Sequence, residues 1–379
     1  MNEDIFRRMV AIRRDLHQHP ELARQEVRTA RQICAHLAEL GIKHHMVAKT
    51  GVVADLPGPA KPHIALRADM DALPIGEETE LSYRSQIQGL MHACGHDGHV
   101  AMLLGAAELL IDDTLPAPVR LIFQPAEEIA LGAQAVIADG VMEDVGMIFS
   151  GHLDNRYLPG QIAISHGVVN ASADHFFIEI KGKSAHAARP HLGVDALVAG
   201  CALAGALQTI VSREINPAIP AVVTVGTFRA GTAPNLIASS AELEGTLRSN
   251  DAEIRLQLQR SLRRIARAVA DVHGVKLTVN IDQGVPCVIN DPEITVLART
   301  AAMTLLGANN VLEMHSPNMG AEDFSYYLQH APGCYVRFGA KPPDTRHPAH
   351  SSQFDIDEAA LWTGATFFRQ VALDAGQVI

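Results

Sequence analysis

The sequence predicts an α/β fold in which a mainly parallel sheet is interrupted by an inserted α+β domain. Short apolar runs at residues 63–68, 119–123 and 145–151 alternate with helical stretches, which is typical of a parallel sheet covered by helices on both faces. From about residue 173 the pattern changes to strand, helix, two strands, helix and strand, which is the order of a ferredoxin-like unit. Because active sites of parallel sheets gather at the carboxyl ends of their strands, polar residues just after the apolar runs are the first candidates for function.

The helices of the first part are predicted from the spacing of apolar residues. Such residues recur at helical spacing over residues 5–16, which indicates an amphipathic helix that ends before Pro20. A second helix is expected over residues 26–40, and two more over residues 100–110 and 132–138. The last two lie between the apolar runs, so they can cover the sheet.

The second pattern is an insertion, because the alternation of helix and strand resumes after about residue 291. We therefore predict one discontinuous domain, residues 1–172 and 289–379, and one inserted domain, residues 173–288. The strands and helices expected in the insertion cover, in order, residues 175–181, 193–212, 221–229, 241–248, 251–273 and 275–281.

Composition excludes several classes of protein. The 379 residues carry a net charge of −11 and are 47% hydrophobic, which argues against disorder and against binding to nucleic acid or to an anionic membrane. The five cysteines show no spacing of a disulfide framework, and we see neither a signal peptide nor an apolar run of about 18 residues. We therefore expect a cytoplasmic protein with no nucleic-acid or membrane partner. Its 19 histidines make metal binding or acid–base chemistry worth examining.

The densest group of potential metal ligands is residues 91–99, MHACGHDGH. The thiolate of Cys94 and the imidazole of His96 suit zinc and, by exchange, manganese, iron or cobalt. A closed structural zinc site would need a second Cys/His pair, which the sequence lacks. A polar loop in which Asp97 only caps the following helix is the other alternative.

Glu127 and Glu128 directly follow the apolar run at residues 119–123. Because neighbouring side chains diverge at the end of a strand, one carboxylate can bind a metal while the other acts as a general base on water. A glutamate pair more often forms a solvated face, and a lone histidine such as His152 or His350 is more often structural. Both histidines nevertheless fit the pattern of a polar residue at the end of an expected strand, and His152 directly follows an apolar run.

Seven motifs occur in one order over nearly the whole chain. They are RADMDALP (67–74), MHACGHDGH (91–99), QPAEE (124–128), GH (151–152), KGKSAHAARPHLGVDA (181–196), MGAEDF (319–324) and AHSSQFDIDE (349–358). Together they resemble the dinuclear amidohydrolases that include hippurate hydrolase, N-acyl-amino-acid amidohydrolase and the indole-acetyl-amino-acid hydrolases. These belong to the aminoacylase and carboxypeptidase-G type metallopeptidase superfamily.

The resemblance implies a site with two divalent cations per subunit, manganese or zinc, with cobalt or nickel as further candidates. It assigns Glu127 as the general base and Cys94 as the thiolate between the two metals. Asp71 would orient a ligand imidazole, whereas Asp69 is left out because more distant relatives have a histidine there. The five implied metal ligands are Cys94, His96, Glu128, His152 and His350.

The resemblance also implies that the inserted domain forms a homodimer, with a dimer of dimers as an alternative. His186 would reach the active site of the partner subunit and stabilise the oxyanion. Asn235 and Arg248 match positions near the substrate carboxylate. Asn235 is equally well explained as a turn residue, and Arg248 as a solvated residue at the end of a strand.

The implied activity is metal-dependent hydrolysis of N-acyl amino acids, of acetyl, benzoyl or indole-acetyl type, to a carboxylic acid and a free amino acid. A carboxypeptidase or dipeptidase that cleaves beside a free carboxylate is the enzymatic alternative. A metal-bound but inactive binding protein is the alternative from another class, and the presence of Glu127 with all five ligand positions argues against it. Residues 153–161, with the unexpected charges of Asp154 and Arg156, leave the acyl group undefined.

Overall fold

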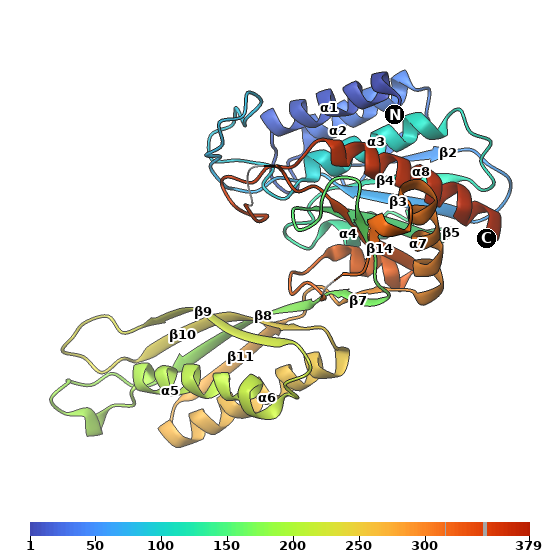
Figure 1. The fold of residues 1–379 in the computed structure, drawn as a ribbon. Helices are drawn as coiled ribbons and strands as arrows, with labels where there is room; N and C mark the ends of the chain where they lie inside the picture. Colours follow the sequence, from blue (N-terminus) through green and yellow to red (C-terminus); the bar gives the residue numbers. More distant parts are fainter. Residues whose placement is uncertain (315, 344–346) are drawn as a thin grey trace. The chain divides into compact units, whose positions relative to one another are not determined.

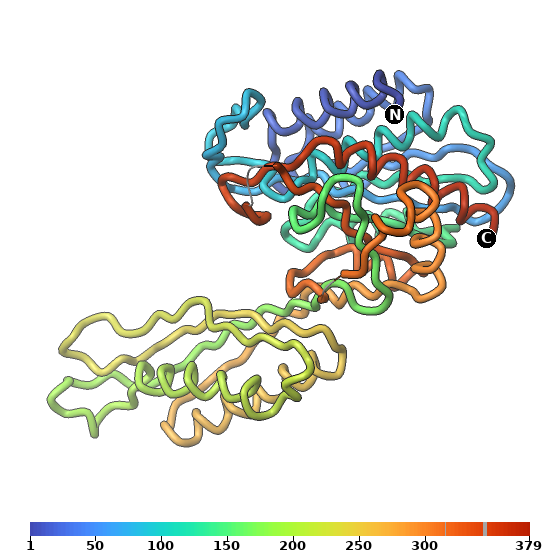
Figure 2. Tube along the Cα trace, in the orientation of Figure 1, coloured from blue at the N-terminus to red at the C-terminus, as the bar shows by residue number. Residues whose placement is uncertain are grey.

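The computed structural model describes residues 1–314, 316–343 and 347–379, and the chain forms two units (Figure 1). One unit comprises Met1–Val169, Ile289–Ser316 and Asp323–Ile379, and the other comprises Asn170–Val288 and Pro317–Glu322. Figure 2 shows the N-terminal and C-terminal segments together in the first unit, while the middle of the chain forms the second.

An eight-stranded sheet forms the centre of the first unit, in the order β1-β2-β4-β3-β5-β14-β6-β13. The neighbouring strands β4, β3, β5 and β14 run parallel, which confirms the prediction of a mainly parallel sheet. The hairpin of β1 and β2 adds an antiparallel edge that we did not predict. The strands are β1 (His44–Val47), β2 (Gly51–Leu56), β3 (His63–Asp69), β4 (Val119–Gln124), β5 (Val145–Asp154), β6 (Ile162–Ala163), β13 (Val311–Leu312) and β14 (Gly333–Gly339).

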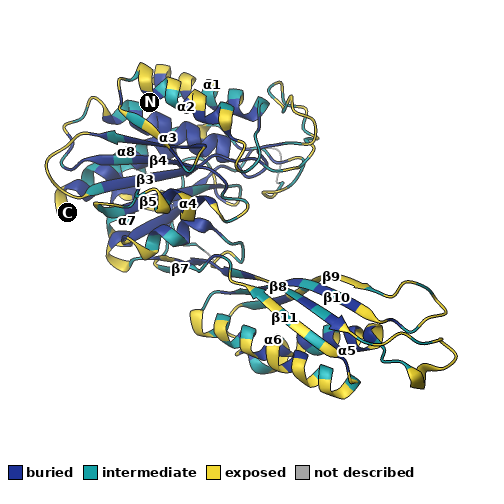
Figure 3. Cartoon of the chain, turned by 180° about the vertical axis from the view of Figure 1, so that it is seen from behind, coloured by how far each residue is buried: buried dark blue, intermediate teal, exposed yellow. Residues whose placement is uncertain are grey.

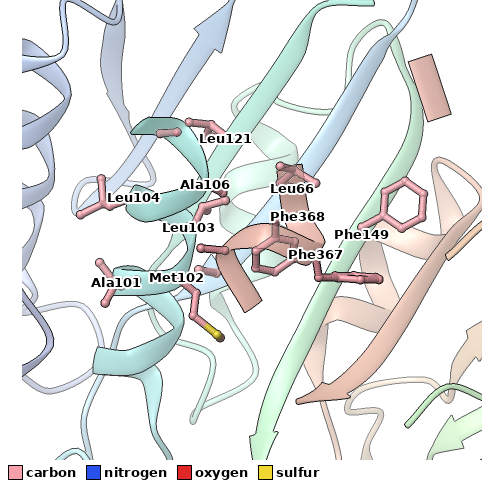
Figure 4. Close-up of a cluster of buried hydrophobic side chains, with 14 of the residues drawn as sticks. Leu66, Ala101, Met102, Leu103, Leu104, Ala106, Leu121, Phe149, Phe367 and Phe368 are labelled. Atoms are coloured by element: carbon pink, nitrogen blue, oxygen red, sulfur yellow. The ribbon is translucent and has the colours of Figure 1, made fainter. Parts of the chain in front are cut away.

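Helices pack around this sheet and bury its apolar side chains. Figure 4 shows Leu66 of β3, Leu103 of α3 and Phe368 of α8 within one cluster of buried side chains. Helix α3 is buried along almost its whole length, so its first turn is held firmly against the sheet. The helices are α1 (Glu3–Gln18), α2 (Val27–Glu39), α3 (His96–Leu110), α4 (Gly132–Ala138), α7 (Pro292–Leu306) and α8 (Ala359–Val378), with short 3₁₀ segments at Ala308–Asn310 and Asp323–Gln329.

The second unit has a four-stranded antiparallel sheet in the order β11-β8-β10-β9, with its own core. The chain order β-α-β-β-α-β confirms the ferredoxin-like prediction. Helix α6 (Ala252–His273) carries exposed residues along its outer side (Figure 3). The elements of the second unit are β8 (Ser172–Lys181), a 3₁₀ turn (Pro190–Leu192), α5 (Ala196–Thr209), a π-helical turn (Ile210–Glu214), β9 (Ala221–Ala230), β10 (Ser240–Ser249), α6 (Ala252–His273) and β11 (Lys276–Asp282). A separate two-stranded sheet pairs β7 (Gly167–Asn170) with β12 (Val288–Asn290).

Among the described helices, only Ala196–Glu214 is long and apolar enough to cross a membrane by length and composition. Its residues Ala199, Leu203 and Leu207 are fully buried in the core of the second unit.

Candidate metal centre

The candidate site lies in the first unit, where several segments follow the carboxyl ends of neighbouring parallel strands. Glu127 and Glu128 follow β4, and His152 lies near the end of β5, which continues two residues beyond it. Cys94 and His96 come from the loop before α3 and from its first residue. At the start of α3, Gly95 has a φ of +88°, a conformation that favours glycine and turns the chain from the loop into the helix.

The donor atoms of the five predicted ligands form two overlapping groups. The Sγ atom of Cys94 and ring nitrogens of His96 and His152 lie within 4.8 Å of one another. The same limit holds for Cys94 together with a carboxylate oxygen of Glu128 and a ring nitrogen of His350. Cys94 belongs to both groups, which is the position a thiolate needs if it is to be shared between two cations.

Hydrogen bonds orient two of the imidazole rings toward this cluster. The Nδ1–H group of His152 donates to the carbonyl oxygen of Leu153 at 2.6 Å, so the lone pair is on Nε2, which accepts the thiol S–H of Cys94 at 3.2 Å. Likewise, Nδ1–H of His96 donates to the carbonyl oxygen of Asp71 at 2.9 Å. A neutral imidazole with one nitrogen fixed by such a bond is the form that binds a metal.

The chemistry of Glu128 and Cys94 also fits divalent cations. The Oε1 atom of Glu128 is buried without a hydrogen-bond partner among the described residues, 3.5 Å from Nε2 of His350 and 3.8 Å from Nε2 of His96. Burial raises the pKa of the Cys94 thiol to about 12, so the sulfur becomes a thiolate only when a cation displaces its proton. A bound cation would satisfy both groups at once.

Asp71 connects the glutamate pair to His96. Its two carboxylate oxygens accept the backbone N–H groups of Glu127 and Glu128, at 3.1 and 3.0 Å. Its own carbonyl oxygen is the acceptor for His96 Nδ1–H. Through these three bonds Asp71 orients both the predicted base and two predicted ligands. The side chain of Glu127 joins them, with a carboxylate oxygen within 4.8 Å of donor atoms of His96 and Glu128.

Asp69 and His99 belong to the same neighbourhood, and sequence reasoning left them out of the site. The Nδ1–H group of His99 donates to Asp69 Oδ1 at 2.5 Å, and the backbone N–H of Leu153 donates to His99 Nε2 at 3.0 Å. With both ring nitrogens engaged, His99 supports the neighbouring peptide and is not placed as a metal ligand. Asp69 is also paired with Arg67, at 2.7 Å. The alternation of RADMD, with Arg67 and Asp69 on one side of β3 and Asp71 two residues beyond its end, is the signal that could have found this group.

The three predicted residues of the inserted domain lie in the second unit. His186 and Asn235 are exposed and lie on adjacent segments, because the N–H of Ala187 donates to the carbonyl oxygen of Asn235 at 3.0 Å. Asn235 lies five residues before the start of β10, whereas Arg248 lies next to the last residue of this strand. Arg248 donates to the carbonyl oxygen of Met319 at 3.1 Å. Since a strand rises about 3.3 Å per residue, the unit itself does not bring Arg248 close to the other two.

The unexpected charges of residues 153–161 pair with each other. The Nε and Nη2 groups of Arg156 donate to the two carboxylate oxygens of Asp154, at 3.0 and 2.7 Å. These charges therefore do not by themselves define a site for a charged acyl group.

The chain is similar to known proteins over most of its length. The model of peptidase family M20/M25/M40 matches residues 65–374. N-acetyl-L-cysteine deacetylase of Bacillus subtilis is 41% identical, over 97% of this chain and 88% of that protein. Thermostable carboxypeptidase 1 of Saccharolobus solfataricus is 38% identical, over 94% and 92%. The crystal structure of Bacillus subtilis YXEP, a dinuclear metal binding peptidase, superimposes with a TM-score of 0.88 at 36% identity and covers 100% of both chains.

Proposed function

Because the chain belongs to peptidase family M20/M25/M40, we propose that it is a metal-dependent amidohydrolase that cleaves N-acyl amino acids into a carboxylic acid and a free amino acid. The observation that carries this proposal is the cluster of Cys94, His96, Glu128, His152 and His350 with Glu127 beside it. Relatives named as an N-acetyl-L-cysteine deacetylase and as IAA-amino acid hydrolases of Arabidopsis thaliana support this substrate class. The carboxypeptidase relatives support the alternative of a peptide substrate with a free C-terminal carboxylate.

Two divalent cations per subunit are supported by the donor set and by the dinuclear structure that is 36% identical. We propose manganese or zinc as the native metal, with cobalt or nickel as further candidates, since Cys, His and Glu ligands suit all four. Cys94, His96, Glu128, His152 and His350 are the proposed ligands.

The reaction assigns a separate task to each residue of the site. When bound, the two cations supply Lewis-acid activation of the attacking water and of the scissile carbonyl group. Glu127 accepts a proton from the water at its carboxylate and then returns that proton to the nitrogen of the departing amine. Asp71 accepts the backbone N–H groups of Glu127 and Glu128, so the positions of the base and of the ligand relative to each other are fixed.

His186 is proposed to stabilise the oxyanion in the active site of a second subunit. Asn235 and Arg248, proposed to recognise the substrate carboxylate, lie toward opposite ends of β10. If both contact one substrate, two subunits must contribute to each site, and this supports a homodimer.

The proposed function is tested by one assay of the purified protein. Enzyme loaded with zinc, manganese or cobalt is incubated with acetyl, benzoyl and indole-acetyl amino acids and with dipeptides, and released amine is measured. Hydrolysis of the acyl amino acids is expected, and elemental analysis of the untreated protein identifies the native metal. Cleavage of the peptides alone would replace the proposal by the carboxypeptidase alternative.

Replacing Cys94 by serine is expected to weaken metal retention by at least about tenfold. The substitution removes a donor that lies in both ligand groups, and a neutral hydroxyl is a poorer metal ligand than a thiolate. Metal content after dialysis against a chelator measures the effect. Cys201→Ser, at an exposed position of the second unit, is the matched control and should retain the metals; equal retention by both variants would contradict the role of Cys94.

Mixing two inactive variants is expected to restore partial activity if His186 acts across a dimer. A heterodimer of His186→Ala and Glu127→Gln subunits contains one site with both an intact base and an intact His186. Loss of one oxyanion donor costs about 10²–10³ in turnover, so recovered activity is readily measured. Absence of recovery, with subunit exchange verified by differently tagged chains, would show that His186 does not act in trans.

A further inference from the structure

The turn that carries Glu127 and Glu128 has an unusual backbone. Ala126 and Ala130, which flank the pair, have φ angles of +55° and +57°. Residues other than glycine seldom adopt this left-handed conformation, so the surrounding structure must hold them there. The direction in which the two glutamates point therefore depends on what fixes this turn.

Two buried carboxylates fix it through three successive N–H groups. Asp71 accepts the N–H groups of Glu127 and Glu128. Glu26 accepts the third, because its Oε1 atom lies 2.9 Å from the backbone nitrogen of Ala126. Its other oxygen, Oε2, accepts the hydroxyl of Thr50 at 2.7 Å. Glu26 thus binds the left-handed residue itself.

The side chain of Glu26 does not cap the helix that follows it. It lies at the N-terminal boundary of α2, yet its side chain makes no capping bond there within the described structure. The residue is completely buried, and burial raises the pKa of its carboxyl group. Burying a carboxylate is unfavourable unless hydrogen bonds compensate for the lost hydration. Its carboxylate accepts its own backbone N–H, the hydroxyl of Thr50 and the backbone N–H of Ala126, which is 100 positions away along the chain.

We propose that Glu26 is a positioning residue of the active site: by holding the N–H of Ala126 it sets the direction of Glu127 and Glu128. The inference rests on the proposed roles of these two glutamates. Glu26 lies outside all seven motifs that pointed to the site, and it acts through the backbone of the turn.

Two substitutions separate the hydrogen bond from the charge. Glu26→Gln removes the charge but keeps an oxygen that can accept from Ala126 N–H and an amide that can donate to Thr50. Glu26→Asp keeps the charge but shortens the reach by one methylene group, so the bond to Ala126 is lost. Thr50→Val is the control, because it perturbs the same buried pair without removing the Ala126 bond.

Each variant is measured for kcat and KM, for Co²⁺ affinity, for the visible spectrum of the Co²⁺-loaded protein and for thermal unfolding. We expect Glu26→Asp to lower kcat or Co²⁺ affinity by about 10–100-fold and to change the spectrum, with KM little altered. Glu26→Gln and Thr50→Val should keep the wild-type kcat and spectrum, even where their unfolding temperatures fall.

The reverse order, with Glu26→Gln impaired and Glu26→Asp intact, would overturn the proposal in favour of a role for the charge. Equal kcat values and spectra in all variants, with only the unfolding temperature altered, would show a purely structural role. If the wild-type protein hydrolyses none of the substrates, the proposed function fails. Co²⁺ affinity and the spectrum then still decide whether Glu26 positions the ligand Glu128.

Discussion

Replacing Glu127 by glutamine is expected to lower kcat by about 10²–10⁴-fold while both cations remain bound. Glutamine has nearly the same shape, and the backbone N–H of Glu127 stays bonded to Asp71, but the amide cannot accept the proton of the attacking water. The change is measured as kcat on the best substrate of the assay, together with metal content by elemental analysis.

Glu128→Gln is the matched contrast, since it makes the same substitution at the neighbouring position. Because Glu128 is a proposed ligand, this variant should lose metal affinity, and added metal should restore part of its activity. Activity of Glu127→Gln close to that of the wild type would remove Glu127 as the base. Loss of metal from both variants would mean that the two carboxylates do not divide the tasks as proposed.

Replacing Arg13 by methionine is expected to destabilise the protein by about 3–5 kcal/mol, because the buried carboxylate of Asp97 loses one of its two positively charged partners and keeps only His17. The guanidinium is 1% exposed and donates to Asp97 at 3.0 Å, to Asp355 at 2.9 Å and to Glu358 at 3.2 Å. It thereby ties α1 to the first turn of α3 and to the segment before α8. Denaturant unfolding of the purified variant measures the loss.

Arg14→Met is the control for this prediction. Arg14 bonds the same Glu358 but its side chain is 45% exposed, so its loss should cost less than about 1 kcal/mol. Similar destabilisation by both substitutions would contradict the importance of the buried pair.

The pH dependence of the Arg13→Met effect follows from Asp97. Burial acts to raise the pKa of Asp97, but the positive charges of Arg13 and His17 outweigh it and hold that pKa well below its usual range. Stability from this carboxylate is therefore complete above about pH 4, the unfolded value, and is lost as the pH falls further. The difference in unfolding free energy between the wild type and Arg13→Met should narrow below about pH 4.

Much of the fold could be predicted because its signals are local. The strands β3 and β4 are apolar runs, and α6 begins after Asp251, whose side chain caps it, and ends before Gly274. The hairpin of β1 and β2 was missed, since the outer strand β1 has only four residues and two of them are exposed. Helix α3 begins at His96, four residues before the predicted start, because the polar residues of its first turn are buried in the site and hide the apolar periodicity.

The sequence by itself predicted the kinds of donor and placed Glu127, Glu128 and His152 at the ends of neighbouring parallel strands, because the carboxyl ends of such strands meet at one edge of the sheet. Only the tertiary structure decided what orients them. Glu26 meets Ala126 and Arg13 meets Asp97 across 100 and 84 positions of the chain. No local propensity encodes such contacts, since they exist only when α1 and α2 pack beside the site and exclude water from these bonds.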